Sequence, residues 1–194
     1  MLQVLFYLQV FGYWVYAIQL SRNMGDTGPL RFLSQHFTLG LHSFTNLHTI
    51  ITSQFSHNSI FHFGINMYVL HSFGSTMLYT FGAKKFLKLY ALSGLSCAAT
   101  SLYYKKSMYD QRQGVPNASS GASGCISGVL ASFTLLYPRA TVTVLFFPMP
   151  AWVAFGGLVC YDIYNATKEV QGSVDAAGHL GGSLGGLLWY LTLR

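Results

Sequence analysis

The chain has 194 residues, of which 52% are hydrophobic and only 8% are charged, and its net charge is +6. Its mean hydropathy is +0.39. A soluble domain carries about 25% charged residues, so this chain has too little charge to cover a water-facing surface, and lipid is the expected solvent. The lysines and arginines fall between apolar runs, which favours contacts with lipid headgroups and argues against a nucleic-acid-binding surface.

Six apolar runs follow one another along the chain. A membrane helix needs about 20 apolar residues, and the candidate spans lie near 2–20, 60–81, 86–104, 122–137, 149–167 and 176–193. The pattern predicts an all-α, polytopic membrane protein whose single domain, 1–194, is a six-transmembrane-helix bundle. The first run lacks a basic segment before it and a small-residue cleavage site after it, so we expect a span and not a cleaved signal.

The segments between the runs carry their own signals. The region 21–57 is aromatic and histidine-bearing, and we expect it to be ordered. The stretch TVTVLFF is β-branched and aromatic, and Pro148 and Pro150 follow it, so we expect an extended interfacial loop and a helix that begins at Met149. The cysteines lie in or beside apolar stretches and are predicted to be buried thiols without a disulfide framework; they are Cys97, Cys125 and Cys160.

Glycines recur at four-residue intervals in the fourth and sixth runs. One row is Gly124 and Gly128, and the others are Gly178, Gly182 and Gly186 and, beside them, Gly181 and Gly185. Rows of small residues let membrane helices approach closely. We therefore expect the fourth and sixth spans to pack tightly and to bring their polar residues within a few ångströms.

Polar groups stand at membrane depth in the same runs. His179 lies in the sixth run, and Ser123 begins the fourth. His62 and Asn66 are four residues apart in the second run and so share a helix face, with His57 just ahead of it. An ionisable residue at this depth is expensive and is by default a functional hypothesis.

Three chemistries use such a set of residues. A metal site is disfavoured, because H-E-x-x-H is absent and no Asp, Glu or Cys stands at ligand spacing from a histidine; neither a metal nor a cofactor is predicted. A polar pore lined by histidine is a second reading, although no inverted repeat is evident. Nucleophilic catalysis is the third, since a serine hydroxyl becomes reactive once a histidine takes its proton.

Three motifs resemble those of the rhomboid intramembrane serine proteases. Gly121-Ala122-Ser123-Gly124 resembles their G-x-S-G motif, and His179-Leu180-Gly181-Gly182, continuing to Gly186, resembles H-x-x-G-x-x-x-G. His57, His62 and Asn66 resemble H-x-x-x-x-H-x-x-x-N. The motifs occur in the family's order, and the surrounding residues look closest to the mitochondrial, presenilin-associated rhomboid-like branch.

The resemblance implies a role for each matching residue. Ser123 matches the nucleophile and His179 the general base, while His62, Asn66 and the Ser123 backbone N–H match the oxyanion donors. Span five, with Trp152 and Phe155 filling the seam toward span two, matches the family's proposed substrate gate. The implied partners are transmembrane protein substrates and membrane lipids, and the implied location is the mitochondrial inner membrane. The alternatives are an inactive rhomboid-like scaffold that binds membrane helices, or a polar channel.

The sequence departs from the family's pattern near these motifs. Ser127 stands where many bacterial members have a tyrosine that stacks on the catalytic histidine, so another group must orient His179. Asp175, one turn before His179, is expected to cap span six and not to complete a triad. Mitochondrial members also carry an N-terminal segment and span that this chain lacks, which suits a fragment, a partial gene model or a six-span relative.

Overall fold

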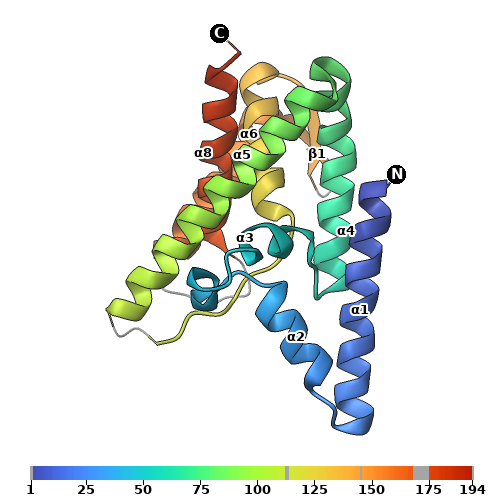
Figure 1. Ribbon diagram of the computed structural model, residues 1–194. Helices are drawn as coiled ribbons and strands as arrows, with labels where there is room; N and C mark the ends of the chain where they lie inside the picture. The colour runs from blue at the N-terminus through green and yellow to red at the C-terminus, as the bar shows by residue number, and fades with distance from the viewer. Residues whose placement is uncertain (1, 112–113, 145, 168–174, 194) are drawn as a thin grey trace.

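The computed structural model describes residues 2–111, 114–144, 146–167 and 175–193, with side chains from Val10 onward (Figure 1). The helices are α1 (Leu2–Met24), α2 (Gly28–His36), α3 (Thr49–Thr52), α4 (Ile60–Val69), α5 (Ser75–Asp110), α6 (Ser123–Leu136), α7 (Ala151–Thr167) and α8 (Ala176–Leu191). Shorter elements are two 3-10 turns (Leu41–Phe44 and Ser53–Phe55), a π turn (Leu70–Gly74) and the strands β1 (Thr141–Val144) and β2 (Phe147–Pro150). The region 21–57 is ordered, as predicted.

The second and third apolar runs are joined by a break inside α5. Helix α4 continues through the π turn into the start of α5, and the helix then bends at Gly82, where φ is 74° and ψ is 166°. A positive φ is a conformation that glycine adopts without a steric penalty. The break falls between the predicted runs 60–81 and 86–104, so the expected short connection is present.

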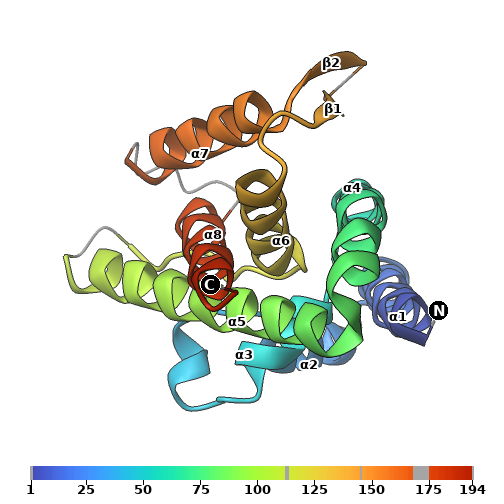
Figure 2. The same cartoon turned by 90° about the horizontal axis from the view of Figure 1, so that it is seen from above.

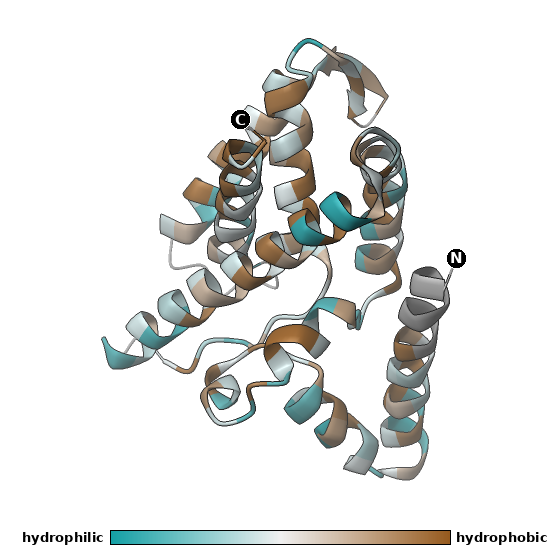
Figure 3. Cartoon of the chain, turned by 45° about the horizontal axis from the view of Figure 1, so that its top comes forward, coloured by the Kyte–Doolittle hydropathy of each residue, from teal (hydrophilic) through white to brown (hydrophobic). Residues whose placement is uncertain are grey.

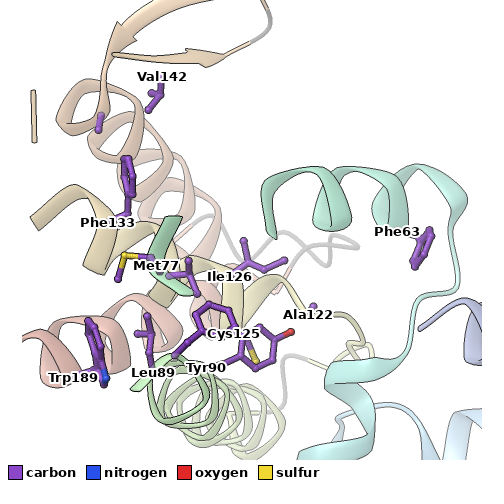
Figure 4. Close-up of a cluster of buried hydrophobic side chains, with 13 residues drawn as sticks. Phe63, Met77, Leu89, Tyr90, Ala122, Cys125, Ile126, Phe133, Val142 and Trp189 are labelled. Carbon is purple, nitrogen blue, oxygen red and sulfur yellow. The ribbon is translucent and has the colours of Figure 1, made fainter. Parts of the chain in front are cut away.

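Helix α8 packs against α5 and α6 in the middle of the bundle (Figure 2). A Cβ atom built on Gly182 would lie 2.0 Å from the carbonyl oxygen of Gly124, and one on Gly186 would lie 2.2 Å from that of Gly128. Such contacts are possible only without side chains, which confirms the predicted close approach of α6 and α8. Around them lies the main hydrophobic core (Figure 4), with Met77, Leu89, Tyr90, Cys125, Ile126, Phe133 and Trp189 among its members.

Three expectations need correction. The fold is not purely helical, because β1 and β2 form an antiparallel pair in which Thr141 faces Pro150; Leu145 lies outside the described residues. Met149 therefore belongs to β2, and α7 begins two residues later, at Ala151. Cys160 is exposed and not buried, since α7 turns most of its surface away from the bundle; the other two cysteines are half-buried and buried.

The described helices differ in hydropathy along their length. Figure 3 shows hydrophobic residues along the bundle helices, with hydrophilic residues gathered near the bend and at the far end of α5. Within the part of the chain that the structure describes, no helix is both long enough and apolar enough to cross a membrane. The count of six spans therefore stays a prediction.

Candidate active site

Ser123 is the first residue of α6, directly after a glycine-containing turn. Gly121 has a φ of 128°, and a Cβ atom there would lie 2.7 Å from Cε1 of His62, so both the backbone conformation and the ring contact require glycine. The first backbone N–H groups of a helix have no partner within the helix and carry a partial positive charge. The turn thus places the Ser123 side chain beside a ready-made site for a developing negative charge.

The Ser123 hydroxyl meets a histidine from α8. The distance between Ser123 Oγ and His179 Nε2 is 2.8 Å, within the range of a nucleophile and its base. The glycine contacts between α6 and α8 hold the two backbones close enough for this bond. The motifs on the fourth and sixth runs, 56 residues apart, are therefore brought together.

The same turn is also lined by residues of α4 and of the segment just before it, namely His62, Asn66 and His57. Asn66 is buried and donates one amide hydrogen from Nδ2 to the His62 carbonyl at 2.8 Å, which leaves its second hydrogen for a ligand. His57 is fully buried and its Nε2 accepts the Ala122 backbone N–H at 3.3 Å. Burial, together with the charge of neighbouring His62, lowers the pKa of His57 to about 4, so this ring is neutral and can accept that bond.

A cavity of about 680 Å³ opens over these residues. Its lining includes Ser123, His179, His62, Asn66 and the polar loop 117–121. Pockets of this size, with a few convergent polar groups, are typical of ligand-binding and active sites. Among the described residues, no group of three or more His, Cys, Asp or Glu side chains is arranged to hold a metal ion.

Comparison with known proteins identifies the family to which this site belongs. The Rhomboid domain family matches residues 45–194. The chain belongs to the rhomboid family. This confirms the resemblance drawn from the three motifs and makes the protein a member of a family of polytopic membrane proteins.

Similar proteins occur across the eukaryotes. Rhomboid protein 1, mitochondrial, of Saccharomyces cerevisiae is 39% identical over 166 residues, which cover 84% of this chain and 47% of that protein. The human presenilin-associated rhomboid-like protein, mitochondrial, is 33% identical over 84% of this chain and 42% of its own. RHOMBOID-like protein 12, mitochondrial, of Arabidopsis thaliana is also 33% identical, over 84% and 52%. The chain spans about half the length of the curated relatives it matches.

In this member of the rhomboid family, sequence reasoning missed a carboxylate from α7. Asp162 is only 2% exposed, and its Oδ1 lies 3.2 Å from His179 Nδ1. His179 therefore stands between Ser123 on one ring nitrogen and Asp162 on the other. The available signal was that Asp162 is an ionisable residue inside an apolar run, which alone marks a functional candidate.

A second missed feature is a buried charge cluster beside the site. Lys105 Nζ lies 2.8 Å from Asp175 Oδ2, and it also donates to Ser101 and Ser119. Asp175 accepts the Gly178 backbone N–H at 2.9 Å, which confirms its predicted capping role. Burial raises the pKa of the Asp175 carboxyl, but the Lys105 charge and three hydrogen bonds outweigh this effect and lower the pKa to about 2.

The predicted gate residues lie away from the cavity lining. Trp152 is 59% exposed and Phe155 is half-buried. In the described part of the chain, α7 packs on α6, α8 and the hairpin, and Figure 2 shows it standing apart from α4. The seam toward span two is thus not filled by these aromatic side chains, because α7 leans toward α8 instead.

Proposed function

We propose that this protein is an intramembrane serine endopeptidase that cuts transmembrane segments of other membrane proteins. The observation that carries the proposal is the 2.8 Å contact between Ser123 Oγ and His179 Nε2, made beside the cavity at the start of α6. A scaffold that merely binds helices has no need of a serine and a histidine in this arrangement.

The reaction follows from the positions of these groups. Ser123 Oγ attacks the carbonyl carbon of the scissile peptide while His179 Nε2 takes the hydroxyl proton. The same proton then passes to the leaving amine, which breaks the C–N bond and leaves an acyl-enzyme. A water molecule, deprotonated by His179, hydrolyses the ester and restores Ser123.

The tetrahedral intermediates carry a negative oxygen that needs hydrogen-bond donors. The Ser123 backbone N–H supplies one at the positive end of α6. His62 and the second amide hydrogen of Asn66 line the same cavity and supply the others. No metal or cofactor takes part in this scheme.

The proposed setting is the mitochondrial inner membrane, a location suggested by the mitochondrial names of the yeast, human and plant relatives and by the resemblance described above. Six spans would be formed by α1, by α4 with the start of α5, by the rest of α5, and by α6, α7 and α8. Substrate helices reach the cavity laterally between α4 and α7. Phe61 and Ile65, exposed residues of α4 that line the cavity, face this route.

Purified protein in detergent or liposomes tests the proposal. A fluorophosphonate probe should label the wild type, and a single-pass membrane substrate should be cut. Ser123→Ala and His179→Ala should each abolish both signals, and the double variant should be no worse, because the pair acts as a unit. Ser183→Ala, one turn after His179, is the matched control and should retain activity. A folded wild type that neither labels nor cleaves would favour the scaffold.

A further inference from the structure

Helix α7 is the outermost helix beside α8, and it buries very little of itself. Along Ala151–Thr167 the buried residues are Ala151, at the first position, and Asp162. The aromatic residues on either side of Asp162, Tyr161 and Tyr164, are more than half exposed. The side chain that α7 inserts into the bundle is thus a carboxylate, where packing alone would favour an apolar group.

Burying a carboxylate has a large cost unless a partner compensates it. Desolvation of one ion costs several kcal/mol even after the protein relaxes. Among the described residues, the partner of Asp162 is His179, whose side chain is 16% exposed while that of Asp162 is 3% exposed. A contact retained against this cost, and directed at the histidine that faces Ser123, is the kind of contact that a functional site preserves.

The contact decides which ring nitrogen of His179 carries the proton. A neutral imidazole donates through one nitrogen and accepts through the other. If Nδ1 donates to the Asp162 carboxylate, Nε2 is left as the acceptor toward Ser123, which is the form that a general base requires. If the proton sat on Nε2, the histidine could not take the serine proton.

We propose that Asp162 is a positioning residue that holds His179 in the Nδ1–H tautomer and in its orientation toward Ser123. The inference rests on the proposed protease function for its catalytic consequence, but the contact itself does not. Asp162 thereby orients His179 where Ser127 does not, since the Ser127 hydroxyl donates its hydrogen bond to the carbonyl of Ser123. It also ties the base to α7, so that the base is set only while α7 is docked on α8.

The first test compares Asp162→Asn with wild type in the cleavage assay. The amide keeps the volume of the side chain but can donate to Nδ1 and so favour the wrong tautomer. In a soluble serine protease the corresponding change costs about 10⁴ in kcat. At 3.2 Å the bond here lies at the long end of the usual hydrogen-bond range, and we expect kcat to fall roughly 10- to 100-fold with KM little changed. Asp110→Asn, which removes an exposed carboxylate of α5, is the control and should behave as wild type.

The second test is independent of catalysis. Nitrogen-15 spectra of histidine-labelled protein at pH 8 report the tautomer, and a His179→Gln sample assigns the signal. We expect an Nδ1–H signal for His179 in wild type and its loss in Asp162→Asn. Failure of the protease proposal would show as inert wild type with this signal intact.

Two results would overturn the role of Asp162. One is an Nε2–H tautomer of His179 in the wild type, a measurement that needs no variant to fold. The other is an Asp162→Asn protein with unchanged kcat, or with a raised KM alone, which would leave Asp162 as a docking contact for α7.

Discussion

Replacing Lys105 by methionine tests how the two segments that form the site, the turn before Ser123 and the start of α8, are joined. Lys105 holds Asp175, at the start of the helix that carries His179, and Ser119, in the turn that leads to Ser123. The side chains of Lys105 and Asp175 are 7% and 15% exposed. Methionine retains the length of the apolar stem but removes the charge, so Asp175 is left buried without its partner.

The size of the effect can be bounded in two ways. The depression of the Asp175 pKa from 3.8 to about 2 corresponds to about 2 kcal/mol of stability at neutral pH. Removing one partner of a buried pair costs about 3–5 kcal/mol in proteins generally. For a chain of this length, these values correspond to a fall in Tm of roughly 5 to 15 °C.

Thermal unfolding in detergent, followed by tryptophan fluorescence, measures this loss. The double variant Lys105→Met, Asp175→Asn should recover much of it, because asparagine is also a good helix cap and carries no charge. A Lys105→Met protein that unfolds within about 2 °C of wild type, or a double variant no more stable than the single one, would refute the reasoning.

The same cluster predicts a pH dependence with a definite sign. The folded-state pKa of Asp175 lies below its unfolded value, so the stabilisation is present above about pH 4 and is lost as the pH falls toward 2. Lys105→Met should weaken this loss, since without the lysine the carboxyl no longer has a depressed pKa. Unfolding midpoints measured at pH 2.5 and pH 7 in both proteins decide the point.

Three further predictions concern the oxyanion donors, the gate and the glycine contacts. His62→Ala and Asn66→Ala should each lower kcat by less than the roughly 10²–10³-fold seen for a single donor in a soluble protease, and unchanged turnover in both would leave them as packing residues. Trp152→Ala should leave cleavage of a transmembrane substrate and of a soluble peptide unchanged, because this side chain lies away from the cavity lining; a raised rate for the transmembrane substrate alone would make Trp152 a gate residue after all. Gly182→Ala should cost about 1–3 kcal/mol or more through overpacking, while Gly156→Ala, with open space around it, should be neutral or stabilising. Matching losses in the two glycine variants would contradict the close contact of α6 and α8.

The features that the sequence predicted are those governed by short-range patterns. The four-residue glycine repeats required α6 and α8 to meet, and Asp175 caps α8 because its acceptor lies three residues from Gly178. The helix start at Met149 was wrong because proline fits both a first helical turn and an edge strand. The pairing of β1 with β2 decided between them.

The missed features depend on how helices lean on one another. Lys105 and Asp175 are 70 residues apart, and nothing in either local pattern identifies the other. The burial of Asp162 and the exposure of Cys160, two residues earlier, follow from which narrow face of α7 meets α8. Hydropathy shows that such a segment is apolar, but it does not show which side faces a neighbour.

The contacts of the site converge on the first two turns of α8. Asp175 fixes the start of the helix to Lys105, Gly182 fixes its second turn against α6, and His179 lies between these two anchors. Because the helix is anchored both before and after His179, the backbone of this residue has little freedom to move toward or away from Ser123. What the anchors leave open is rotation of its ring, and Asp162 restrains that rotation from α7. The distance from His179 to Ser123 is thus set by the packing of α8 on α5 and α6, and the orientation of the His179 ring is set by α7. A variant that loosens α7 should therefore impair the chemistry while leaving α6 and α8 in place.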